Sequence, residues 1–88
     1  MKKEKPTSQD LFELGQFYLL NQKFSEAIKK FKEALKLKPD DSKIYFHLGL
    51  AYEGACFISE AKEMFRKVLE LDSSSKEAAA HLDRLTSD

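Results

Sequence analysis

Apolar residues recur along this chain with the spacing of an α-helix. The first run has the spacing i, i+3, i+4, i+7 and consists of Leu11, Leu14, Gly15 and Tyr18. A second run of the same kind extends from Phe24 to Leu35. The residues Asn21-Gln22-Lys23 between the runs are polar, and the segment has the length of a helix–helix turn. The pattern therefore predicts two helices joined in a hairpin.

The hairpin occurs twice, because residues 8–41 align with residues 42–75 without a gap. The two segments share the same residue at eleven positions, which are Ser8/Ser42, Phe12/Phe46, Leu14/Leu48, Gly15/Gly49, Tyr18/Tyr52, Ser25/Ser59, Glu26/Glu60, Ala27/Ala61, Phe31/Phe65, Leu35/Leu69 and Leu37/Leu71. A fixed period of 34 residues indicates stacked supersecondary units. The period places the helices of the second unit near residues 43–54 and 58–71.

Capping residues mark where these helices begin and end. Thr7 and Asp10 have the spacing of a capping box before the first helix, and Pro39 ends the second helix. The acidic and hydroxyl residues of segment 40–42 supply a cap for the third helix. The predicted boundaries therefore agree with the apolar runs.

A last helix, residues 76–86, follows the second unit. Ser74 and Glu77 have the spacing of a capping box at its start. Its apolar stripe consists of Ala78, Ala79, Leu82 and Leu85. Such a helix covers the end of a stack of repeats. We therefore expect an all-α fold of five helices, with residues 8–88 as a single domain and residues 1–7 as a flexible N-terminal segment.

The two units resemble the tetratricopeptide repeat, whose pattern is W-x2-L-G-x2-Y, then A-x3-F, then P. The first unit matches this pattern at Leu11, Leu14, Gly15, Tyr18, Ala27, Phe31 and Pro39. The second unit matches it at Tyr45, Leu48, Gly49, Tyr52, Ala61 and Phe65, with Ser73 in place of the proline. The resemblance implies two helical hairpins and a capping helix, which form a fragment of a right-handed α-solenoid. The glycine usual in the family's turn is Gln22 in one unit and Cys56 in the other, so strained backbone is expected at both.

Composition narrows the class of protein further. The 88 residues are 42% hydrophobic and 34% charged, which excludes a disordered tail and a membrane protein. Fifteen basic residues balance fifteen acidic ones, so we expect neither nucleic acid nor a membrane surface as a partner. The charged start is followed by an apolar run of only Phe17 to Leu20, unlike a signal peptide, and the chain has one cysteine. A cytoplasmic location is the expectation.

The sequence contains no pattern of catalytic residues. Cys56 lies in a turn with no histidine or aspartate patterned beside it, so we expect no enzyme activity and no cofactor. Glu13, His47 and His81 are 34 residues apart and therefore line up on three neighbouring helices. Helix axes spaced roughly 8–10 Å apart are too wide for easy convergence on a metal ion, so a polar row that faces a partner is the favoured interpretation.

The resemblance to the family implies where function lies. In tetratricopeptide-repeat proteins the first helix of each unit lines a groove that holds a peptide or helix of another protein. Helical phase places four large apolar side chains on that side, which are Phe12, Leu20, Phe46 and Leu50. They are expected among the polar residues Glu13, Gln16, His47, Glu53 and His81. The predicted function is therefore a protein-interaction module, a small adaptor or scaffold.

Two kinds of partner can be considered from the sequence: an acidic chaperone tail and a second copy of the chain. Family members that hold acidic chaperone tails use lysine, arginine and asparagine at five places, which here hold Phe12, Gln16, His47, Glu77 and His81. None of these is a lysine or arginine, so the sequence predicts that such tails are not bound. Self-association into a homo-oligomer through exposed apolar surfaces, such as an uncapped N-terminal face with Phe17 and Ile28, stays open as a second function.

Overall fold

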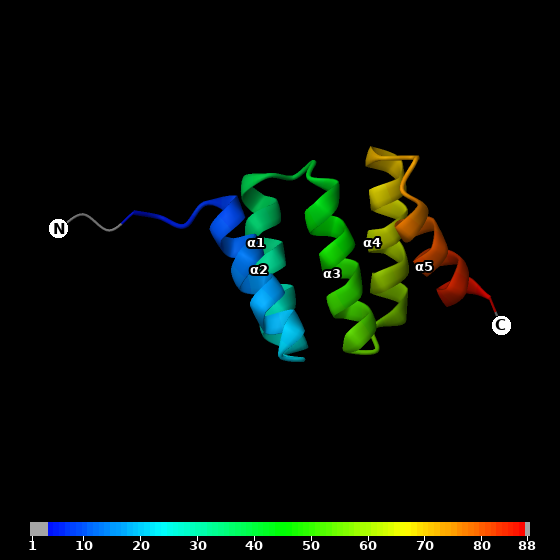
Figure 1. Ribbon diagram of the computed structural model, residues 1–88, viewed down its shortest axis with the longest axis horizontal. Helices are drawn as coiled ribbons and strands as arrows, with labels where there is room; N and C mark the ends of the chain where they lie inside the picture. Colours follow the sequence, from blue (N-terminus) through cyan, green and yellow to red (C-terminus); the bar gives the residue numbers. More distant parts are fainter. Residues whose placement is uncertain (1–3, 88) are drawn as a thin grey trace.

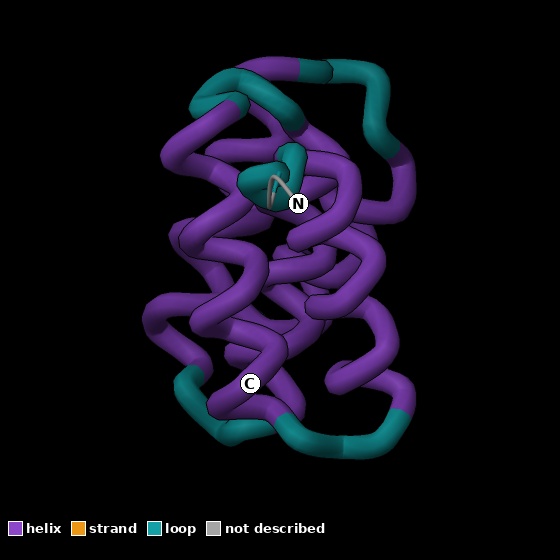
Figure 2. The backbone as a smooth tube through the Cα atoms, turned by 90° about the vertical axis from the view of Figure 1, so that its left-hand side faces the viewer, coloured by secondary structure: helices purple, strands orange, loops and turns teal. Residues whose placement is uncertain are grey.

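The computed structural model describes residues 4–87, which form five α-helices and no strand (Figure 1). In chain order they are α1 Ser8–Leu20, α2 Phe24–Leu37, α3 Ser42–Gly54, α4 Ile58–Leu71 and α5 Lys76–Thr86. The predicted all-α class is confirmed, and the bounds predicted for the third, fourth and fifth helices agree with these to within one residue. Figure 2 shows that the connecting loops lie at the two ends of the stacked helices.

Side-chain caps begin three of the helices. At α1 the predicted capping box is present, because Thr7 Oγ1 accepts from the Asp10 N–H and Asp10 Oδ2 accepts from the Thr7 N–H, both at 3.0 Å. At α3, Asp41 Oδ1 accepts from the Lys43 N–H at 3.0 Å. The expected capping box at the fifth helix is wrong by one residue: Ser75 caps α5, whereas the Ser74 hydroxyl donates to Asp72 within the preceding turn.

Both hairpin turns contain a non-glycine residue in the left-handed region, as expected. Gln22 has φ 59° and Cys56 has φ 67°. In each turn the next N–H donates back to a carbonyl five residues earlier, Lys23 to Tyr18 at 2.9 Å and Phe57 to Tyr52 at 2.8 Å. Such a bond closes the C-terminus of a helix when the residue before it is left-handed. The strained residue therefore makes the tight reversal between the paired helices possible.

The paired helices approach each other closely at the glycine of each repeat. A Cβ atom at Gly15 would lie 2.5 Å from Phe31 Cε1, and one at Gly49 would lie 2.8 Å from Phe65 Cε1. Phe31 and Phe65 are fully buried, each in one of two apolar clusters. Any side chain larger than hydrogen would push the helices apart, which is why both units have glycine here.

One side of α1 is more exposed than the equivalent side of α3, the first helix of the second repeat. Leu48 in α3 is 2% exposed, because α3 packs against α2. Leu14, its counterpart in α1, was expected in the core but is 38% exposed. No described helix precedes α1, so the inward face that the repeat pattern predicts is only partly covered there.

Candidate functional site

A ladder of aromatic and histidine rings runs across α1, α3 and α5. His47 lies with its ring edge-on to Phe12 at a centroid distance of 4.9 Å, and it also contacts Phe31 at 6.0 Å. The same arrangement recurs 34 residues later, where His81 lies 5.5 Å from Phe46 and is stacked on Phe65 at 5.0 Å. Each histidine therefore packs against the two phenylalanines of the preceding hairpin.

The ladder explains why one predicted site residue is wrong. Phe12 was expected to face outward, but it is 4% exposed and belongs to the first apolar cluster. The Lys43 ammonium lies 5.0 Å from the centroid of the Phe12 ring and, with His47, closes over it. Phe46 is half-buried; the residue equivalent to Lys43 in α5 is Glu77, and no cation among residues 4–87 lies over the Phe46 ring.

His47 has one hydrogen-bond partner within α3 and one in α1. Its Nδ1 lies 2.9 Å from the Lys43 carbonyl oxygen, and because a carbonyl can only accept, Nδ1 carries the proton. In the neutral ring Nε2 is then an acceptor, and Gln16 Nε2 lies 3.4 Å from it in a position to donate. The predicted residues Gln16 and His47 are thus brought together at the surface.

A charged pair holds α5 against α3. Arg84 Nη1 lies 2.7 Å from Glu53 Oε2, and Arg84 Nη2 donates to His81 Nδ1 at 2.8 Å. The hydrogen bond that Arg84 donates to Glu53, and then the negative charge of Glu53, hold the pKa of the Arg84 guanidinium above its usual value. Glu53 Oε1 is buried, lies 3.4 Å from His81 Nδ1 and accepts no hydrogen bond within the described residues. Glu53 therefore bonds to Arg84 through Oε2 alone.

Sequence reasoning missed Arg84, although the repeat could have found it. Arg84 follows Leu50 by one period and Gln16 by two, so all three have the same helical phase. We call the surface formed by these three residues, the neighbouring rings of the ladder and Glu53 the inner surface. Its seven residues are Gln16, Phe46, His47, Leu50, Glu53, His81 and Arg84.

Two predicted site residues of α1 lie away from the inner surface or at its margin. Leu20 is 84% exposed, but its counterpart Gly54 faces α2, where an added Cβ would clash with the Phe24 ring. Leu20 therefore lies on the side of α1 that corresponds to the α2-facing side of α3, and the expectation that it joins Leu50 is wrong. Glu13 is exposed at the margin, where its carboxylate accepts from Gln9 Nε2 at 2.9 Å.

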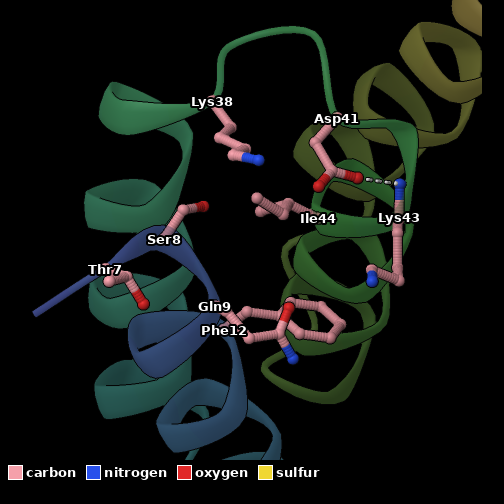
Figure 3. A pocket seen from close by; sticks show the side chains of 8 residues that line it. All are labelled: Thr7, Ser8, Gln9, Phe12, Lys38, Asp41, Lys43 and Ile44. Carbon is pink, nitrogen blue, oxygen red and sulfur yellow. Dashed lines mark hydrogen bonds between the residues drawn. The ribbon is translucent and has the colours of Figure 1, made fainter.

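A pocket of about 550 Å³ lies beside the inner surface, between the start of α1 and the start of α3 (Figure 3). Its lining combines hydroxyl, amide, charged and apolar groups from Thr7, Ser8, Gln9, Phe12, Lys38, Asp41, Lys43 and Ile44. Ser8 is buried and donates from its hydroxyl to the Ala34 carbonyl at 3.2 Å, which joins α1 to the end of α2.

Other kinds of site are less well supported by the described residues. Between residues 4 and 87, no group of three or more histidine, cysteine, aspartate and glutamate side chains could hold a metal ion. Cys56 is exposed and unpaired in the second turn. Among the helices just described, none has both the length and the apolar character needed to cross a membrane.

Comparisons with known proteins agree with the repeat pattern. A family model described as "TPR repeat" matches residues 15–54, and one described as "Tetratricopeptide repeat" matches residues 42–75. Heat shock protein STI1 of Saccharomyces cerevisiae is 40% identical over 68 residues, which are 77% of this chain and 12% of that protein. The chain thus spans about an eighth of the length of this curated relative.

Two solved structures have the same arrangement of helices. The second TPR domain of human RPAP3, solved in complex with the HSP70 peptide SGPTIEEVD, superposes with a TM-score of 0.88 at 28% identity. The match covers 93% of this chain and 68% of that one. The Arabidopsis OM64 TPR domain gives a TM-score of 0.87 at 24% identity over 91% and 66% of the two chains, which shows the fold alone.

Proposed function

Because the chain belongs to the tetratricopeptide-repeat family, whose members are protein-interaction scaffolds, we propose that it binds a peptide or helix of a partner protein across its inner surface. The proposal makes α1, α3 and α5 the binding helices and gives the chain no catalytic role. A cytoplasmic location is part of the proposal and rests on the composition of the sequence.

The observation that carries the proposal is the mixed chemistry of the inner surface. Leu50 is a partly buried apolar side chain packed on the second cluster. Its repeat counterparts are Gln16 on α1, which lies beside the His47 imidazole, and Arg84 on α5, whose side chain is 56% exposed. A surface that alternates apolar contacts with hydrogen-bonding groups fits a peptide, which offers side chains and backbone amides in turn.

The relative from human RPAP3 supports a peptide as the kind of ligand, since that domain was solved with one. The identity of the ligand does not carry over. In this chain Phe12 is in the core, and Gln16 and His47 bond to each other, where clamp-bearing relatives would place groups for terminal carboxylates. We propose recognition through the Leu50 region and the neighbouring hydrogen-bonding groups.

The proposal is tested with peptides selected from a random display library and titrated against the purified chain. Leu50→Ala should weaken binding roughly tenfold, because about 1.4 kcal/mol of apolar burial is lost. Gln16→Ala should also weaken binding. The matched control is Lys29→Ala on the exposed side of α2. Peptides whose affinity falls with Lys29→Ala and is unchanged by Leu50→Ala would place the site on the other side and contradict the proposal.

A further inference from the structure

The first helix carries an exposed apolar stripe that the proposed function does not use. Leu14 is 38% exposed, Phe17 is 59% exposed and Leu20 is 84% exposed. Their spacing of three residues places them along one side of α1. Ile28 of α2, which the sequence also suggested for this face, is partly buried against the first cluster. The stripe therefore consists of these three α1 residues.

The internal repeat shows what the same positions do when they are covered. Leu48 and Ala51, the counterparts of Leu14 and Phe17 in α3, are 2% and 0% exposed. Gly54, the counterpart of Leu20, lies against Phe24 of α2. In α3 these positions form the contact with the preceding hairpin. The α1 stripe is thus a helix-packing face, and within the described residues no helix covers it.

The other end of the stack does not complement this stripe. In α3, Tyr45, Gly49 and Tyr52 face α4, and their counterparts in α5 are the exposed residues Ala79, Asp83 and Thr86. A second copy docked head to tail would have to press its apolar stripe against Asp83. Burial of an unpaired carboxylate is costly, so this arrangement is disfavoured.

We propose that the stripe docks on the same stripe of a second copy of this chain, in a symmetric dimer with antiparallel α1 helices. A register centred on Phe17 places Phe17 against its own counterpart and Leu14 against Leu20 of the second copy, since both pairs of residue numbers have the same sum. The antiparallel arrangement also brings the acidic Asp10 end of one α1 near Lys23, which follows α1 in the other copy. Charge and apolar pattern therefore favour the same register.

The dimer is weak, because three side chains make a smaller contact than the roughly 800 Å² per partner of a standard interface. Sedimentation equilibrium on the full chain from about 5 to 500 μM is the first test. The expected mass rises with concentration from 10.1 kDa toward twice that value. Phe17→Glu should hold the mass at that of the monomer, while Leu37→Glu, at a 56%-exposed position of α2, should leave the association unchanged.

A cross-link tests the register. In a Cys56→Ser background, Phe17→Cys should form a disulfide-linked dimer under mild oxidation, because the two residues 17 face each other across the two-fold axis. Leu37→Cys in the same background should not. A monomer at 500 μM, association that survives Phe17→Glu, or equal cross-linking of both cysteine variants would each overturn the proposal.

Discussion

His47 and His81 occupy equivalent places in successive hairpins, yet their Nδ1 atoms have opposite hydrogen-bonding roles. Nδ1 of His47 donates to the Lys43 carbonyl, whereas Nδ1 of His81 accepts from the Arg84 guanidinium. The difference arises from the side chain one turn further along α5, since Arg84 is bound to Glu53 and directs a second N–H at the imidazole. The repeat thus determines which phenylalanines each ring packs against, and the neighbouring polar groups determine whether its Nδ1 donates or accepts.

This relationship predicts opposite tautomers for two equivalent histidines. At about pH 8, where imidazoles are ordinarily neutral, His47 should carry its proton on Nδ1 and His81 on Nε2. Long-range ¹H–¹⁵N spectra of the imidazole rings distinguish the two forms. Arg84→Ala should remove the preference of His81 and leave His47 unchanged. The same tautomer at both rings in the unmodified chain would contradict the assigned bonds.

Gly15→Ala should destabilise the protein, because the added Cβ would lie 2.5 Å from the buried Phe31 ring. We expect a loss of roughly 1–3 kcal/mol in the free energy of unfolding, measured by urea denaturation. The control is Ser25→Ala at an exposed position of α2, which should change little. A gain of about 1 kcal/mol, as helix propensity alone gives, would show that α1 and α2 are less closely packed.

Gln22→Gly should stabilise the protein, because Gln22 has φ 59°. Relief of left-handed strain is worth about 1–2 kcal/mol, and the greater freedom of glycine in the unfolded chain offsets about 0.4–1 kcal/mol. The urea midpoint should rise for this variant and for Cys56→Gly, which has φ 67°. Gln22→Ala should give no such rise. Midpoints that rise equally for alanine and glycine would exclude strain as the cause.

The HSP70 peptide SGPTIEEVD should not bind this chain as a terminal-carboxylate ligand. The five places that form the clamp in the family hold no lysine or arginine here, and Phe12 is buried. Fluorescence polarisation with the labelled peptide should show no saturation up to roughly 1 mM, which corresponds to about −4 kcal/mol of binding free energy. Saturable binding that is lost when the terminal carboxylate is amidated would contradict this prediction.

The helices and turns were predictable because they depend on local rules. Apolar spacing and the 34-residue period predicted the five helices, and the lack of a turn glycine at Gln22 and Cys56 correctly indicated strained backbone there. Phe12 was misplaced because helical phase puts it on a flank. Only its contacts with Lys43 and His47 of the next hairpin decide that it is buried. Leu14 was misplaced for the opposite reason, since its burial requires a preceding helix.

The candidate site was predictable only in part. Gln16 and His47 were expected on one surface and are bonded to each other, and His81 lies beside Glu53. The repeat period gives Arg84 the same helical phase as Gln16 and Leu50, but its ion pair with Glu53, 31 residues away, could not be predicted from a local pattern. Leu20 was placed on the wrong side of α1, because an expectation of exposure alone does not say which side of a helix a residue occupies. Comparison with its repeat counterpart Gly54 supplies that information.

The central claim, that a partner segment binds on the inner surface, is tested most directly by amide chemical shifts during titration with a selected peptide. Saturable shifts are expected at Gln16, His47, Leu50 and His81, and they should be absent from the exposed α2 residues around Lys29. Leu50→Ala should reduce the affinity measured in the same titration. Shifts confined to α2 and α4, with those four residues unmoved, would contradict the account.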